Sequence, residues 1–274
     1  MEWRTFLPKR ISRASAIFWI GLFIIVIFFF WSSHITSLVE VGSENIMYAF
    51  APSTQRAFDY GERHFDATDA SLYNLNRAEY FFNKVAVVDP TFPYLYHELA
   101  RISFLRGNYR KAMAQIDLQI TIHGDTEPNS YYVRGLIEGY MGTYDAAATD
   151  YEHFLQFDPN DWAAINDYAW ILLKAARNAE AARVTDAALK NFPDNPWLLN
   201  SNATAHYEIG EYTQALVSVK KAVTLSGSLT PDEWLHAYPG NDPSIASEGI
   251  ASFQKAALDN MHSIEAKLAT STVQ

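Results

Sequence analysis

Two runs, Gly107-Asn-Tyr-Arg-Lys-Ala112 and Gly210-Glu-Tyr-Thr-Gln-Ala215, decide the fold, because each places a glycine, an aromatic ring and a small residue at the same spacing. They belong to a stretch from Pro93 to Leu229 in which one pattern recurs. The markers of the predicted first helices are Ala100, Gly135, Ala169 and Ala203, at steps of 35, 34 and 34 residues. The markers of the predicted second helices, Ala112, Ala147, Ala181 and Ala215, keep the same steps of 35, 34 and 34 residues. Two marker positions with one spacing predict a stack of helix–turn–helix units.

The residue types at these positions have physical reasons. A small residue lets two helix axes approach closely where the helices of a unit cross. Gly107, Gly142 and Gly210 stand between the predicted helices, where a positive φ ends the first one. Pro159 and Pro193 stop the second helix, because proline cannot continue it. Each unit then buries its apolar face on its neighbours, as in a solenoid.

With its glycine and tyrosine at the turn and its closing proline, the pattern resembles the tetratricopeptide repeat. We count five units over residues 59–229. The first is the weakest: its second helix fits at Ala78, Phe82, Val85 and Pro90, whereas its first helix, within 54–66, lacks the small-residue signature. The resemblance implies an all-α, tetratricopeptide-type solenoid with a scaffolding role and no chemistry.

The N-terminal part predicts a membrane anchor. Residues 14–39 contain no Asp, Glu, Lys or Arg, and four basic residues precede them. We therefore predict a cytoplasmic basic tail at 1–13, one transmembrane helix at 14–36 and a juxtamembrane connector at 37–58. The positive-inside rule places the N-terminus in the cytoplasm and the repeats outside it, at the cell (inner) membrane of a bacterium. A cleaved signal peptide and a buried core helix are the alternatives; if the orientation is reversed, a cytoplasmic adaptor follows.

Residues 230–274 are predicted to close the solenoid. The segment from Ser226 to Pro243 is rich in turn formers and reads as a loop, and a final helix starts at about Asp242–Pro243. Its apolar stripe recurs at steps of 3 and 4: Ile250, Phe253, Ala257, Met261, Ile264 and Leu268. We interpret this helix as a cap on the apolar end of the stack, with a dimerisation helix as the alternative.

Composition excludes several classes of function. The chain has a net charge of −10, which opposes binding to nucleic acid, and no cysteine, which removes thiolate chemistry. His97-Glu98 begins like a zinc-protease motif, but Arg101 stands where the second histidine is needed. We expect no catalytic, cofactor or metal site, no small-molecule substrate and no enzymatic activity.

The resemblance implies a partner-binding groove on the concave side, lined by the first helix of each unit. Aromatic and arginine side chains are frequent anchors at protein interfaces. Asn129, Phe104, Leu136, Leu173 and Thr204 lie on the same helical faces, and each of these side chains could instead pack between units. The candidate groove residues are Tyr94, His97, Arg101, Tyr132, Tyr140, Asn166, Trp170, Lys174, Trp197, Asn200 and Tyr207.

Two functions follow from these observations. The first is a membrane-anchored scaffold that binds a peptide or protein partner in the aromatic-lined groove. The alternative is a structural subunit of a permanent membrane or envelope complex, assembled through the outer face or the C-terminal helix.

Overall fold

The computed structural model describes residues 42–49, 52–66, 70–238 and 240–271. The predicted basic tail and the transmembrane helix at 14–36 lie outside the described residues. Within those ranges, no helix is both long and apolar enough to cross a membrane. The chain divides into two compact units, Met1–Pro52 and Ser53–Gln274. Residues 42–49 of the first unit are helical.

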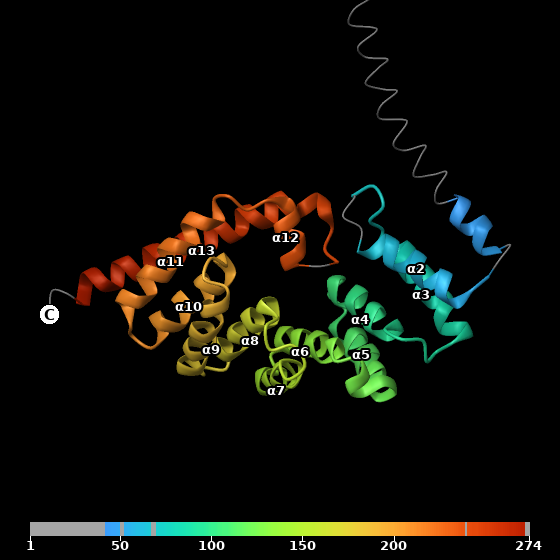
Figure 1. Ribbon diagram of the computed structural model, residues 1–274, viewed down its shortest axis with the longest axis horizontal. Helices are drawn as coiled ribbons and strands as arrows, with labels where there is room; N and C mark the ends of the chain where they lie inside the picture. Colours follow the sequence, from blue (N-terminus) through green and yellow to red (C-terminus); the bar gives the residue numbers. More distant parts are fainter. Residues whose placement is uncertain (1–41, 50–51, 67–69, 239, 272–274) are drawn as a thin grey trace, which may run out of the picture. The chain divides into compact units, whose positions relative to one another are not determined.

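The second unit consists of helices joined by short turns (Figure 1). Ten of these helices form five pairs: α2 (Thr54–Phe65) with α3 (Leu75–Val88), α4 (Leu95–Leu105) with α5 (Tyr109–His123), α6 (Asn129–Met141) with α7 (Tyr144–Phe154), α8 (Trp162–Lys174) with α9 (Asn178–Asn191), and α10 (Pro196–Glu208) with α11 (Tyr212–Ser226). A short 3-10 helix, η1 (Gly124–Thr126), precedes α6. The all-α repeat architecture expected from the sequence is confirmed.

The pairs stack so that the first helices of the last four pairs form one continuous layer, which we call the first-helix layer. Helix α4 contacts α6, α6 contacts α8, and α8 contacts α10. The second helices α3, α5, α7 and α9 pack on their own partners and on the first helix of the following pair, and α11 packs on α10 and on the C-terminal helix. The first-helix layer carries the face on which the sequence placed the groove.

The marker residues lie where the helices cross. The seven alanines among them are completely buried, at 0% exposure. A Cβ at Gly135 would lie 3.0 Å from the ring of Tyr151, so only glycine fits there without displacement. The turn glycines have positive φ, as expected, but Ala176 takes this position in the α8–α9 turn with φ of 58°. Alanine is strained in that conformation.

The first unit, whose signature was weak in the sequence, is a complete helix pair. Gly61 acts as its small residue, since a Cβ there would lie 2.5 Å from the ring of Phe82. Helix α3 in turn packs on α4, so this pair stacks on the rest of the solenoid.

The segment predicted as a loop from Ser226 to Pro243 contains a helix, α12 (Pro231–Ala237), and that prediction was wrong in this part. The reason is local: Thr230 and Glu233 form a capping box, and Pro231 occupies the first turn. A second 3-10 helix, η2 (Pro243–Ile245), is capped by Asp242 and leads into the long helix α13 (Ala246–Ser271).

Helix α13 covers the C-terminal end of the stack. It packs on α11, with further contacts to α10 and α12. The predicted apolar stripe faces these helices: Ala257 and Ile264 are buried at 0% and 1% exposure, and Ile250 at 8%. Burial of such a stripe removes apolar surface that the last repeat would otherwise expose.

Residues 234–238 and 240–241, which we call the C-terminal bridge, return to the N-terminal repeats (Figure 1). The Tyr73 hydroxyl donates a hydrogen bond to the Gly240 carbonyl at 2.8 Å. Gly240 has φ of +81°, and a Cβ there would lie 2.7 Å from an Arg101 guanidinium nitrogen. The bridge therefore crosses the first-helix layer and contacts repeats far from its own in sequence.

Candidate functional site

A cavity of about 570 Å³ lies between the first-helix layer and the C-terminal bridge. Four successive first helices contribute to it: Arg101 and Phe104 come from α4, Tyr132 and Tyr140 from α6, Asn166, Asp167 and Trp170 from α8, and Trp197 and Asn200 from α10. Trp234, Tyr238 and Asn241 of the bridge and Phe253 of α13 form the opposite wall. The volume is in the range of about 300–1,000 Å³ that is usual for ligand pockets.

One wall of the cavity is a row of aromatic rings that passes from repeat to repeat. The ring centroids of Phe104 and Tyr140 are 5.0 Å apart with an edge-to-face geometry, and those of Tyr140 and Trp170 are 5.5 Å apart. Tyr140 remains 55% exposed, so the row presents ring surface as well as packing between units. The three rings do not occupy equivalent repeat positions, since they are 36 and 30 residues apart; the row is continuous because all three point to the same side of adjacent first helices.

A second aromatic cluster closes the C-terminal end. Trp197 stacks on Phe253 of α13, with ring centroids 5.4 Å apart, and on Trp162 at 5.3 Å. Tyr238 of the bridge meets Trp197 edge to face, at 6.5 Å. Trp197 itself is only 6% exposed, so its ring serves mainly to hold the C-terminal bridge and α13 against the repeats.

Asp167 is the acidic side chain among the residues that line the cavity. The Tyr132 hydroxyl donates to its carboxylate at 2.9 Å, and the Asn166 amide lies 3.4 Å from its other oxygen. Burial raises the pKa of Asp167 to about 6, although the hydrogen bonds from Tyr132 and Asn166 oppose this and the charge of Asp161 adds to it. A carboxylate kept in such surroundings is costly when ionised.

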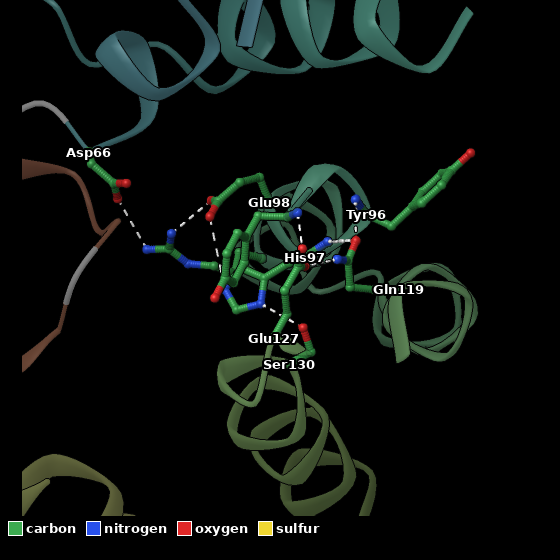
Figure 2. A network of polar contacts seen from close by, with 9 residues as sticks. Asp66, Tyr96, His97, Glu98, Gln119, Glu127 and Ser130 are labelled. Carbon is green, nitrogen blue, oxygen red and sulfur yellow. Dashed lines mark hydrogen bonds and ion pairs between the residues drawn. The ribbon is translucent and has the colours of Figure 1, made fainter. Parts of the chain in front are cut away.

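Arg101, at the N-terminal end of the cavity, is neutralised within the chain by Glu98 and Asp66, the two carboxylates labelled in Figure 2. Its guanidinium forms ion pairs with Glu98 at 2.7 Å and with Asp66 at 3.1 Å, and it lies over the ring of Phe65. Burial raises the pKa of Glu98 to about 7, and the neighbouring Arg101 charge opposes the rise. Arg101 was a candidate partner-binding residue of the groove, but two carboxylates of this chain already hold it.

A buried polar network next to this cluster fixes the start of α4 (Figure 2). The Gln119 side-chain oxygen accepts from the backbone N–H groups of Tyr96 and His97, at 2.9 and 3.2 Å. Glu127 accepts from the Tyr94 N–H at 2.9 Å and from the Gln119 amide. These acceptors satisfy donors that the first turn of a helix leaves free.

His97 belongs to that network rather than to the cavity wall. It is 7% exposed, and its ring lies 3.3 Å from the Ser130 hydroxyl. Burial, helped by the Arg101 charge, lowers the pKa of His97 to about 3. In the described part of the chain, no three His, Asp or Glu side chains are arranged to hold a metal ion.

The structure brings most of the candidate groove residues together. Those that line the cavity are Arg101, Tyr132, Tyr140, Asn166, Trp170, Trp197 and Asn200. The other candidates lie elsewhere. Tyr94 caps α4 and packs edge to face on His97, Lys174 is exposed at the end of α8, and Tyr207 packs on Tyr212.

Sequence reasoning missed two parts of the site. Asp167 is adjacent to the candidate Asn166, but the positions carried over from the resemblance did not include it. The bridge and Phe253 were missed because nothing in a repeat pattern indicates that a segment beyond the last repeat covers the first ones. The capping box at Thr230 was a readable signal for α12.

Comparison with known proteins agrees with this architecture. A sequence profile described as tetratricopeptide repeat matches residues 92–238, which is more than half of the chain. The chain therefore belongs to the tetratricopeptide repeat family, whose members generally mediate protein–protein interactions. No curated protein sequence matches the chain significantly.

Among solved structures, a tetratricopeptide repeat protein from Parabacteroides merdae matches with a TM-score of 0.56 at 15% identity, over 82% of this chain and 84% of that one. YrrB, described as having an unusual peptide-binding site, matches with a TM-score of 0.55 at 14% identity, over 68% of this chain and 93% of that one. MamA from AMB-1 matches with a TM-score of 0.54 at 18% identity, over 63% of this chain and 99% of that one. At these identities the likeness concerns the fold alone.

Proposed function

We propose that this chain is a membrane-anchored scaffold that binds a peptide or protein partner in the cavity formed by its first-helix layer, and that it is not an enzyme. The observation that carries the proposal is the aromatic row Phe104–Tyr140–Trp170, which extends over three repeats and keeps ring surface exposed. Aromatic rings supply large contact areas at little conformational cost, which is why they anchor interfaces. The peptide-binding site named for YrrB supports the same use of this fold.

The test is site-specific photo-crosslinking in the native cell, with the photo-reactive phenylalanine derivative at Tyr140 or at Val217. Both side chains are exposed, at 55% and 67%, and Val217 lies on α11 rather than on the cavity. The proposal predicts a defined partner adduct from position 140 and none from 217. Trp170→Ala in the position-140 protein is expected to reduce the adduct strongly.

The alternative, a structural subunit assembled through its outer face, gives the opposite result. An adduct from Val217 that persists with Trp170→Ala, and none from Tyr140, would replace the scaffold proposal with that one. The two positions therefore separate the two functions in one experiment.

We also propose that residues 14–36 anchor the chain in the inner membrane, with the repeats outside the cytoplasm. The support is the charge-free stretch from 14 to 39 and the basic residues that precede it. A reporter active only outside the cytoplasm, fused after Gln274, is expected to give signal, and one active only inside is expected to be silent. The reverse pattern excludes this orientation and makes a cytoplasmic adaptor the better proposal.

A further inference from the structure

The cavity contains a carboxylate with no cation to balance it. Asp167 lies on its wall with a tyrosine and an asparagine as hydrogen-bond donors, and no Lys, Arg or His among the described residues forms an ion pair with it. Arg101 is the basic side chain in the lining, and Glu98 and Asp66 already neutralise it. The cavity therefore carries net negative charge.

The effect of this charge extends across the cavity to both walls. The pKa of Tyr140 is raised, first by burial and then by the charge of Asp167. Burial also raises the pKa of Tyr238, on the bridge, to about 12, and Asp167 again contributes. A negative potential that reaches rings on opposite sides is the potential that a positively charged ligand between them would experience.

The rings around Asp167 suit a cation as well. A cation near the face of a tryptophan or tyrosine ring is attracted by the negative charge density of that face, most strongly when water is excluded. Tyr132, Tyr140 and Trp170 all line the cavity together with Asp167. An apolar ligand would use the rings but would leave the carboxylate desolvated and unpaired, which is unfavourable. A carboxylate ligand would meet the same charge that Asp167 carries.

We propose that this cavity binds a basic side chain, lysine or arginine, of the partner protein, with Asp167 as counter-ion and the rings of Tyr140 and Trp170 around the cation and its aliphatic stem. The inference rests on the proposed scaffold function and specifies the chemistry of its partner. The net charge of −10 on the chain favours such a partner at longer range as well.

Calorimetry on the full chain with short capped peptides tests the proposal. The probes are Ac-Gly-Gly-X-Gly-Gly-amide, with X as lysine, arginine, norleucine or glutamate; norleucine keeps the stem of lysine without its charge. We expect the lysine and arginine peptides to bind at least about tenfold more tightly than the norleucine peptide, because an ion pair and cation–π contacts are added. The glutamate peptide is expected to bind most weakly.

Asp167→Asn is the decisive variant, because it keeps an oxygen that can accept from Tyr132 and removes the charge. It is expected to reduce the preference for lysine over norleucine severalfold, because the ion pair is lost while the rings remain, and the norleucine peptide is expected to bind at least as tightly as before, because it no longer leaves a desolvated charge unpaired. Asp145→Asn, which removes an exposed charge on α7, is the matched control and is expected to keep the preference. Equal binding of the lysine and norleucine peptides to the unchanged protein, or no binding of any basic peptide, overturns the proposal. A lysine preference of undiminished size in Asp167→Asn also overturns it.

The result is separable from the outcome for the scaffold function. If position 140 crosslinks a partner and Asp167→Asn changes neither the adduct nor the peptide preference, the scaffold stands and this inference fails. If the lysine preference depends on Asp167 but no partner adduct forms at position 140, the cation site stands and the scaffold proposal fails.

Discussion

Replacing Asp167 by asparagine is expected to stabilise the protein, and to do so more at neutral than at acidic pH. Burial raises the pKa of this carboxyl from 3.8 to about 6, so the folded state binds its proton more tightly than the unfolded state does. Each pKa unit corresponds to about 1.4 kcal/mol, and the rise therefore amounts to about 3 kcal/mol of folding free energy.

The direction in which stability changes with pH follows from the linkage between protonation and folding. A carboxyl with a raised folded-state pKa leaves stability intact below its unfolded pKa, and stability is lost as the pH rises from about 4 to about 6. Asp167→Asn removes this loss and keeps the hydrogen bond from Tyr132. We expect a gain of about 3 kcal/mol at about pH 7.5 and roughly half of that at about pH 5.

Urea unfolding of the full chain at both pH values, followed by circular dichroism, measures these gains. Asp145→Asn, on the exposed side of α7, is the control and should change the unfolding free energy by less than about 0.5 kcal/mol at either pH. A gain from Asp167→Asn that is the same at both pH values, or a loss, would refute the reasoning, because burial of the charged form would then not be the cause.

Three further changes have expected outcomes. Ala176→Gly relieves the positive φ of 58° in the α8–α9 turn and should raise the unfolding free energy in urea by about 1 kcal/mol; a decrease contradicts the strain argument. In the wild-type chain, Nε and Nη2 of Arg134 donate to the buried carboxylate of Asp150 at 2.6 and 2.8 Å. Arg134→Ala breaks this ion pair and should lower the unfolding free energy by about 3–5 kcal/mol in the same assay. A decrease below about 1 kcal/mol would show that water replaces the arginine. Tyr73→Phe removes the hydrogen bond to the Gly240 carbonyl and should speed hydrogen exchange in the C-terminal bridge, with unchanged exchange as the contrary result.

The repeat architecture was predictable because helix crossings that recur in the structure require small residues that recur in the sequence at the same spacing. Ala100, Ala169 and Ala203 recur at one spacing, and each is completely buried where two helices cross. The helical faces assigned from the repeat register placed Tyr140 and Trp170 on the same side of the stack, although the two are not equivalent positions, and both line the cavity. Contacts between adjacent units are therefore readable from one sequence.

Contacts that do not repeat were not predictable in this way. Gly61 is the small residue of the first unit and meets Phe82 as Gly135 meets Tyr151, but the longer connection between α2 and α3 takes it out of the 34-residue spacing. The bridge reaches Tyr73 through a single hydrogen bond between residues 167 positions apart, and no period encodes such a contact. Arginine is a frequent anchor at protein interfaces, which made Arg101 a candidate. Its ion pair with Asp66 depends on the folded chain, because the two residues lie 35 positions apart outside any helix that they share.

The bridge has a consequence for how the chain unfolds. A solenoid whose repeats contact only their neighbours behaves almost as a one-dimensional array, and its ends open independently of its middle. Here a C-terminal segment is hydrogen-bonded to the loop between α2 and α3, so the terminal repeats are coupled through space as well as along the stack. Opening of the first pair then also loses contacts of the last part of the chain. The repeats are therefore expected to unfold in one cooperative transition. Folding is expected to be slower than in an open solenoid, because the contact between Tyr73 and Gly240 closes a loop of 167 positions.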